Sequence, residues 1–526
     1  MNRLVSALTI FALTLTACAS DTSLWGVYST PTAPIPTVTV PVTDTPIPPT
    51  PTATSVFTDP RPTDVPTATF FSTPTTTLPS PVAVQSITPN PQNQPILYYA
   101  QSGDTLDALA ARFNVSKKEI TSPRTVPETG LIDVGTLLII PDRIDGETTP
   151  AVQILPDSEI VYSATATGFN SDKFIANASG HLSTYREYLG STGWTTGAQA
   201  MKRLADENSV NPRLVLAILE YEAHWVYSGP TDTLHEDYPM GFQSLKYKGL
   251  FMQMVWAVNQ IFNGYYGWRT GTLTELTFPD GETLQLNPEL NAGTVAIQYF
   301  FSRLHNRAEW EGIISPDSVN SFYSLYLQMF GDPWARAQSV EPLFPPGLNQ
   351  PKLVLPFEPN HEWSFTGGPH GAWEEDGPLA AIDLAPSDPT KTWVLSASPG
   401  LVVRSINGVV IVDLDGDGNE HTGWDLLYLH IATDGRVPLN TWVQTNDRIG
   451  HASGEGGVAT GIHLHFARKY NGEWIIADGP LPFVIGGWTV HAGAQPYLGT
   501  LTRGGRTVTA DPVGQAWSII IRLPDE

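Results

Sequence analysis

The residues that decide the fold lie in three stretches near the end of the chain: GGPHGAWEEDGPLAAIDLAP at 367–386, LLYLHI at 426–431 and ATGIHLHF at 459–466. In the third stretch, His463 and His465 are two positions apart. Side chains two positions apart on a strand point to the same face. The alternating apolar residues are then expected to face the core: Ile462, Leu464 and Phe466. The pattern predicts a strand with one imidazole face and one apolar face.

Together the three stretches supply four histidines and one aspartate that can carry chemistry: His370, Asp383, His430, His463 and His465. A catalytic zinc ion takes three nitrogen or oxygen ligands and keeps one position open for water, which becomes a nucleophile near neutral pH. His370, Asp383 and His465 would form such a site. The two remaining imidazoles are then available for proton transfer and for stabilising an oxyanion.

This arrangement resembles the lysostaphin-type zinc endopeptidases, and their beta-lytic branch most of all, in which a His and an Asp precede a Tyr-x-His segment and a final His-x-His strand. The 13 positions between His370 and Asp383 are similar to the longer spacing of that branch. The resemblance covers residues 353–478. It implies that His370, Asp383 and His465 are zinc ligands and that His430 and His463 are catalytic. A copy of the fold that only binds or activates another hydrolase is the alternative.

Composition limits the possible partners. The chain of 526 residues has 52 acidic residues against 28 Lys and Arg, a net charge of −24, which argues against nucleic acid and against electrostatic docking on anionic lipid. Its single cysteine excludes an internal disulfide.

The N-terminus indicates export. A short basic start and an apolar segment from Leu4 to Thr16 predict a signal peptide over residues 1–17. The sequence Leu15-Thr16-Ala17-Cys18 resembles a bacterial lipobox, which implies a lipid on Cys18. An ordinary signal peptide with an incidental cysteine is the alternative. Residues 18–95, rich in Pro and Thr, predict a disordered tether that at about 3 Å per residue would reach on the order of 200 Å.

A compact segment follows at residues 96–143. Gly103-Asp104-Thr105-Leu106 before a predicted helix, and Gly135-Thr136-Leu137 opening a strand, resemble a LysM module, which implies binding to glycans that contain N-acetylglucosamine. Residues 144–160 are interpreted as a linker.

Residues 161–345 predict an all-helical domain. Asn211 and Pro212 are typical of a helix start. The apolar helix that follows carries Glu222, and its pattern resembles a lysozyme-like lytic transglycosylase, which implies that Glu222 is the general acid of a glycan-cleaving site. Ala223 replaces the serine usual in that family. A helical domain that only grips glycan, or packs on the peptidase, is the alternative.

Short β-type runs at residues 352–485 predict an antiparallel β peptidase domain, and residues 486–526 a β-rich tail without an assigned function. Asp413, Asp415 and Asp417, with Gly418, have the spacing of a calcium loop, but the twelfth position is Trp424 and not glutamate. We interpret the loop as a solvated turn, with weak Ca²⁺ binding as the alternative.

The sequence therefore predicts a multidomain α+β chain. Its expected function is that of an exported zinc endopeptidase that hydrolyses the peptide cross-links of bacterial peptidoglycan. It is expected to be anchored by lipid at the cell envelope, to face the cell wall and to bind glycan strands. The alternative is a lipoprotein that binds the wall, or activates a hydrolase, without catalysis. A third reading, cleavage of both glycan and peptide, depends on Glu222.

Overall fold

The computed structural model describes residues 94–374 and 376–524, all of which belong to one unit, residues 79–526. The predicted signal peptide, Cys18 and almost all of the predicted tether lie outside the described residues. Within the described part, no helix combines the length and the apolar character needed to cross a bilayer.

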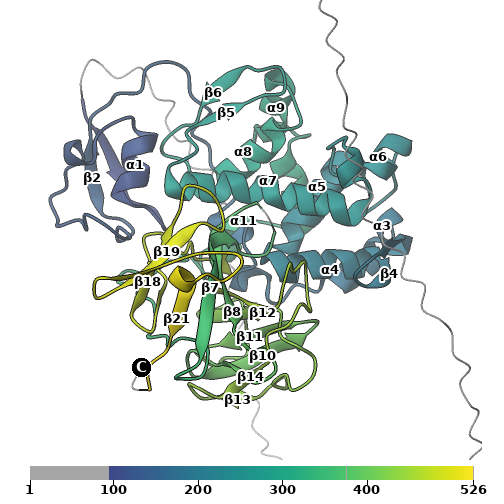
Figure 1. The fold of residues 1–526 in the computed structure, drawn as a ribbon. Helices are drawn as coiled ribbons and strands as arrows, with labels where there is room; N and C mark the ends of the chain where they lie inside the picture. Colours follow the sequence, from purple (N-terminus) through teal and green to yellow (C-terminus); the bar gives the residue numbers. More distant parts are fainter. Residues whose placement is uncertain (1–93, 375, 525–526) are drawn as a thin grey trace, which may run out of the picture. The chain divides into compact units, whose positions relative to one another are not determined.

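The first described segment is a small α/β module (Figure 1). Strands β1 (Ile96–Tyr99) and β2 (Leu137–Ile140) pair antiparallel around helix α1 (Leu106–Arg112) and a short 3-10 turn at Lys117–Glu119. The Thr105 side chain accepts a hydrogen bond from the backbone N–H of Ala108 and so caps α1. Leu109 and Phe113, one helical turn apart, are fully buried in the core of this module.

The helical region, residues 161–345, contains ten α-helices among its described residues. They are α2 (Ser171–Ala178), α3 (His181–Thr184), α4 (Gly197–Asn208), α5 (Pro212–Ala223), α6 (Thr233–Asp237), α7 (Leu250–Thr270), α8 (Ala292–Ser302), α9 (Arg307–Ile314), α10 (Phe322–Phe330) and α11 (Pro333–Ala337). Helix α5 starts as predicted, with the Asn211 side chain accepting from the N–H of Arg213 and Pro212 in the first turn.

The expectation of an all-helical domain was wrong in two places. Two β-hairpins interrupt the helices: β3 (Arg186–Leu189) with β4 (Gly193–Thr196), and β5 (Glu275–Thr277) with β6 (Thr283–Gln285). Gly193, the first residue of β4, and Gly281, in the turn before β6, take positive φ angles of 73° and 88°, a conformation that glycine adopts without steric cost. The predicted linker 144–160 is also part of the packed structure, because Ile154 and Leu155 are buried in the core of the helical region.

Residues 352–524, the sheet region, are built on a nine-stranded antiparallel sheet in the order β13-β10-β11-β12-β15-β8-β7-β21, with β16 beside β15. The strands are β7 (Glu362–Gly371), β8 (Leu379–Pro386), β10 (Gly400–Ile406), β11 (Val409–Asp413), β12 (Trp424–Leu429), β13 (Trp442–Val443), β15 (Leu464–Tyr470), β16 (Glu473–Trp474) and β21 (Ile519–Ile521). A separate pair is formed by β9 (Val394–Leu395) and β14 (Arg448–Gly450). A four-stranded sheet contains β17 (Val484–Ile485), β18 (Trp488–Ala492), β19 (Gly499–Arg503) and β20 (Arg506–Thr509).

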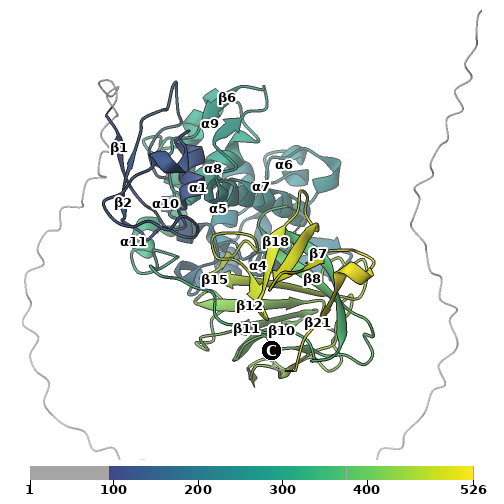
Figure 2. The same cartoon turned by 60° about the vertical axis from the view of Figure 1, so that its left-hand side comes forward.

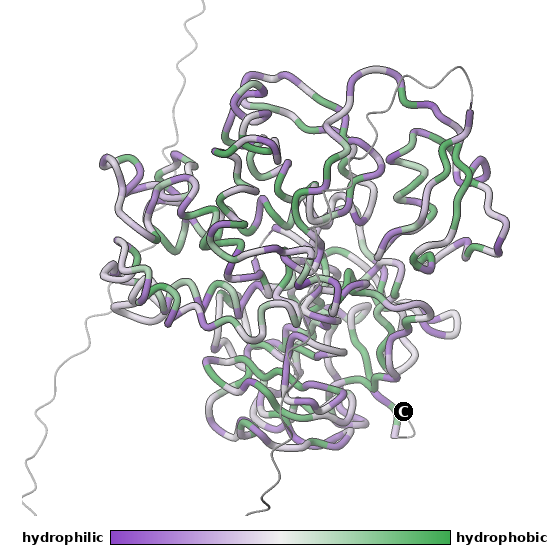
Figure 3. Tube along the Cα trace, turned by 180° about the vertical axis from the view of Figure 1, so that it is seen from behind, coloured by the Kyte–Doolittle hydropathy of each residue, from purple (hydrophilic) through white to green (hydrophobic). Residues whose placement is uncertain are grey.

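The two faces of the large sheet pack against different partners. Alternate residues such as Leu426 and Phe466 share a buried core with the four-stranded sheet, whereas their neighbours Leu427 and Ala467 join the core of the helical region. Figure 2 shows the helices of that region above the strands. Figure 3 shows how apolar and polar residues alternate along the chain. The helical region therefore covers one face of the sheet, and that face also carries His465 and Asp383.

The predicted boundary at residue 486 does not separate two cores. Trp488 and Leu501 are fully buried in the same apolar cluster as Ile382 and Phe466, and β21 pairs with β7 as the last strand of the large sheet. The tail is therefore a structural part of the sheet region.

Candidate metal centre

The strand register brings the candidate residues together. Asp383 on β8 is paired with His465 on β15 on one side and with Gly367 on β7 on the other. A Cβ atom at position 367 would lie 2.6 Å from Oδ2 of Asp383, so glycine makes room for the carboxylate. The register of β7 shifts on both sides of His370, which places this residue opposite Ala381. These irregularities bring the His370 ring beside the carboxylate.

Three atoms converge at this point. Nε2 of His370 lies 3.0 Å from Nδ1 of His465, and Oδ1 of Asp383 lies 3.3 Å from the first nitrogen and 3.4 Å from the second. All three residues are buried. Of the residues that the structure describes, they form one of two groups whose ligand atoms could surround a metal ion.

The other ring nitrogen of each histidine fixes its tautomer. Nδ1 of His370 lies 2.8 Å from the carbonyl oxygen of Gly368, and Nε2 of His465 lies 2.9 Å from that of Ala372. Because a carbonyl oxygen only accepts hydrogen bonds, these two nitrogens must carry the protons. The nitrogens that face each other then present lone pairs, as does the carboxylate oxygen. Three lone pairs aimed at one point repel each other unless a cation lies between them.

The carboxylate oxygen is a second observation that bears on whether these residues fit a metal ion. Among the described residues, Oδ1 of Asp383 is buried and has no hydrogen-bond partner. A charged, buried and unpartnered carboxylate oxygen fits a divalent metal ion.

His430 and His463 lie beside this centre. Their ring centroids are 4.6 Å apart, and Nε2 of His463 is 3.6 Å from Oδ1 of Asp383. Nδ1 of His430 donates to the carbonyl of Glu455, and Nδ1 of His463 to that of Gly461, both at 3.0 Å. Burial, followed by the charge of His463, lowers the pKa of His430 to about 4, so its Nε2 is a free base at neutral pH. In both rings Nδ1 is therefore held by a backbone carbonyl and Nε2 is the other ring nitrogen.

His463 and His465 face the same side as the sequence predicts, but Ile462 does not join the core. Its side chain is exposed because β15 begins at Leu464, two residues later than expected. Leu464 and Phe466 are fully buried on the opposite face of the strand.

Sequence reasoning missed Tyr497. Its ring stacks on that of His370 with centroids 4.2 Å apart, and it is half exposed. Its backbone is also bound to β7, since its carbonyl accepts from the N–H of Gly368 and its N–H donates to the carbonyl of Pro369. No motif marks this residue, because it comes from the tail and reaches the site only through folding. A positive φ of 67° at a tyrosine is the one local sign of its constrained position.

The hydrogen bond and ion pair described for Glu222 involve His305 and none of the residues of this centre. Its Oε1 accepts from Nε2 of His305 at 3.1 Å, and the side chain is 9% exposed. Burial lowers the pKa of His305, but the hydrogen bond and charge of Glu222 outweigh it, so the pKa is raised. The neighbouring Glu220 is bound to the backbone N–H groups of Val226 and Tyr227.

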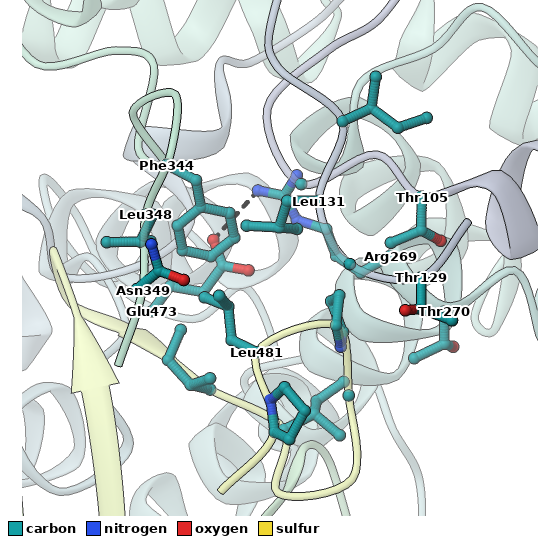
Figure 4. Close-up of a pocket in the computed structure, with 18 of the residues that line it drawn as sticks. Thr105, Thr129, Leu131, Arg269, Thr270, Phe344, Leu348, Asn349, Glu473 and Leu481 are labelled. Carbon is teal, nitrogen blue, oxygen red and sulfur yellow. Dashed lines mark hydrogen bonds and ion pairs between the residues drawn. The ribbon is translucent and has the colours of Figure 1, made fainter. Parts of the chain in front are cut away.

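A cavity of about 740 Å³ lies elsewhere, where the N-terminal module, α7 and the residues after β16 meet (Figure 4). Its wall holds an ion pair in which Arg269 and Glu473 are 3.0 Å apart, next to Phe344. None of the five candidate residues lines it.

Comparison with known proteins gives three findings. Residues 153–343 match the model of the LasA N-terminal domain. Protease LasA of Pseudomonas aeruginosa PAO1 is 22% identical over 381 residues, which is 66% of this chain and 80% of that protein; the protein of strain UCBPP-PA14 is 23% identical with the same coverage. Solved structures include the M23 metalloprotease pseudoalterin from the deep sea, at 20% identity and a TM-score of 0.27, covering 33% of this chain and 99% of that chain. The catalytic domain of lysostaphin from Staphylococcus simulans, at 21% identity and a TM-score of 0.18, covers 22% and 90%. By sequence the chain is thus similar to a LasA-type protease over two thirds of its length, which supports a peptidase as its class.

Proposed function

We propose that this protein is a zinc-dependent endopeptidase that hydrolyses the peptide cross-links of bacterial peptidoglycan. The observation that carries the proposal is the convergence of three lone pairs from His370, Asp383 and His465 at 3.0–3.4 Å, around a carboxylate oxygen with no donor among the described residues. The sequence similarity to Protease LasA supports the peptidase class.

Zinc fits this set better than other common divalent ions. Two imidazole nitrogens and one carboxylate oxygen are a donor set that catalytic zinc uses, whereas calcium and magnesium prefer oxygen alone. Zinc bonds of about 2.0–2.1 Å at tetrahedral angles would separate ligand atoms by about 3.3 Å, close to the observed spacing. The hydrogen bonds from the outer ring nitrogens to Gly368 and Ala372 orient both rings, as is usual around zinc.

Zinc, when bound, would polarise the scissile carbonyl and lower the pKa of a water molecule. The chain's own residues would handle the protons. His430, neutral at pH 7, presents Nε2 as an acceptor for a proton from the attacking water. The proton that His430 takes up would then pass to the nitrogen of the leaving amine, and His463, with its ring centroid 4.6 Å from that of His430, would assist this transfer. Tyr497 holds the His370 ring in place by stacking on it.

The remaining parts of the chain are proposed to deliver this site to its substrate. Residues 96–143 would bind glycan strands as a LysM module, and lipid on Cys18 would hold the protein at the envelope, facing the wall. Glu222 would serve a second, glycan-cleaving reaction only if its pairing with His305 opened, so we treat that role as a separate prediction.

The experiment is digestion of purified sacculi by the zinc-loaded protein, with the products identified by mass spectrometry. New amino and carboxyl termini within the peptide bridges are expected, and they should be absent with the His465→Ala variant. Intact bridges after digestion by a zinc-loaded wild-type protein would reject the peptidase proposal in favour of the alternative, a wall-binding or hydrolase-activating protein.

A further inference from the structure

The hairpin loop between β11 and β12 gathers carboxylates away from the metal centre. Oxygens of Asp413, Asp415 and Asp417 lie within 4.8 Å of one another. Gly416 and Gly418 take positive φ angles of 74° and 85°, which lets the backbone turn around the three side chains. The loop is closed by a hydrogen bond from the N–H of Leu414 to the carbonyl of Trp424.

A fourth carboxylate stands at the base of this loop. Asp425 is directly paired with Asp413 across β11 and β12, so the two side chains share one face of the sheet. Asp425 is fully buried, and neither of its carboxylate oxygens has a hydrogen-bond partner among the described residues. A buried carboxylate without a partner is costly when charged, so it is either protonated or compensated by a cation, and a bound cation would also compensate the three carboxylates beside it.

The side chains nearby do not supply that charge. Lys469 is paired with Asp425 in the strand register, but its Nζ donates to Glu420 at 2.8 Å. Arg404 also forms its ion pair with Glu420. The positive charges in this part of the sheet are therefore those of Lys469 and Arg404. They stand against five carboxylates, which belong to Asp413, Asp415, Asp417, Glu420 and Asp425.

We propose that this loop binds a calcium ion, held by Asp413, Asp415 and Asp417, with Asp425 as the fourth carboxylate. Oxygen-only donors select a hard cation, and calcium accepts the irregular, flexible geometry of a glycine-containing loop more readily than magnesium does. Asp425 is the thirteenth residue counted from Asp413. It takes the place that the sequence pattern, ending on Trp424, leaves without an acidic residue.

Calcium here would stabilise the junction with the helical region. The side chain of Asn419 in this loop donates to Oγ1 of Thr167, and the His421 ring stacks on Tyr162 with centroids 3.7 Å apart. An ordered loop would thus hold the helical region in register with the sheet.

The test uses the full chain, loaded with zinc so that the histidine centre is occupied, and Tb³⁺ as a luminescent probe for calcium. The Trp442 ring lies against Gly416, close enough to sensitise Tb³⁺ in the loop. Saturable luminescence is expected that Ca²⁺ reverses and equal Mg²⁺ does not. Asp417→Asn, at an exposed position, should weaken Tb³⁺ binding at least about tenfold. The matched control Asp434→Asn, outside the loop, should leave it unchanged.

Asp425→Asn tests the fourth ligand. It should weaken Tb³⁺ binding at least about fivefold and, in calcium-free buffer, should melt at a higher temperature than the wild type because an unpartnered buried charge has been removed. Wild-type affinity in Asp425→Asn would overturn the role of Asp425. The absence of saturable binding in the wild type, or equal binding by Asp417→Asn, would overturn the site itself.

Discussion

Glu222 and Asp383 each lie beside a histidine, but their hydrogen bonding differs. Glu222 in the helical region receives a hydrogen bond from His305 at 3.1 Å, so donor and acceptor satisfy each other. Asp383 in the sheet faces two imidazole lone pairs, and its Oδ1 has no donor among the described residues. The difference teaches that a carboxylate next to a histidine is not by itself a metal ligand. What marks the ligand is a set of acceptors that only an added cation can satisfy.

The largest effect is expected from Asp383→Asn, which keeps the shape of the side chain but removes its charge. The variant should lose its metal and at least about 10³ of its rate, because the reaction depends on the metal throughout. Metal analysis and the release of new amino termini from sacculi would measure both losses together. If the variant kept its metal and its full activity, Asp383 would not be a metal ligand, and the contrast with Glu222 would fail.

The replacement His430→Gln should leave the metal in place and lower the rate by about 10²–10⁴, the usual contribution of a general base. His463→Gln is expected to behave in the same way, because its Nε2 also faces the centre. Loss of zinc in either variant would instead make that histidine a ligand.

A smaller loss, about tenfold to a hundredfold, is expected for Tyr497→Ala, the range seen when residues that support metal ligands are removed. Tyr497→Phe keeps the ring that stacks on His370 and tests the hydroxyl alone. If Phe restores the rate, Tyr497 acts by positioning the ring; if Phe is as slow as Ala, the hydroxyl takes part in the reaction.

The junction between the two regions should be sensitive to acid. Burial, and then the charge of Lys469, lowers the pKa of His421 to about 3, below the value of about 6.5 that it has in an unfolded chain. The unfolded state therefore binds more protons between these pH values, and stability falls as the pH drops below about 6.5, by up to about 1.4 kcal/mol per pH unit. Thermal melts of His421→Phe, which keeps the stack on Tyr162, should show a shallower slope than the wild type. An identical slope would remove His421 from the explanation.

The smallest effect is expected for Glu222→Gln, which should change peptide release by less than about twofold because Glu222 is hydrogen-bonded to His305 in the helical region and not to the metal centre. Measurement of anhydro-sugar ends in the same digests would show whether Glu222 has its own reaction. A loss of such ends in this variant, with peptide release intact, would make the helical region a second catalytic unit.

Much of the sheet region could be predicted from sequence. The alternation around His463 and His465 predicted the strand and the shared face, and Asn211-Pro212 predicted the start of α5, because both signals are local. The register shifts in β7 that bring His370 to Asp383 depend on pairing between distant strands. Tyr497 reaches its site through tertiary contacts, so no spacing in the sequence marks it. Packing of the helical region on the peptidase was one of the alternatives that the sequence left open, because the residues that cover the second face of the sheet come from a distant part of the chain.

The central claim is tested most directly by the metal content of the full chain, purified without a histidine tag and dialysed against metal-free buffer. We expect one zinc per chain in the wild type and in the matched control His451→Ala, whose Nδ1 donates to the carbonyl of Thr392 outside the centre. His465→Ala should hold almost none. A wild-type protein that takes up no zinc, or a His465→Ala variant that keeps a full equivalent, would contradict the account.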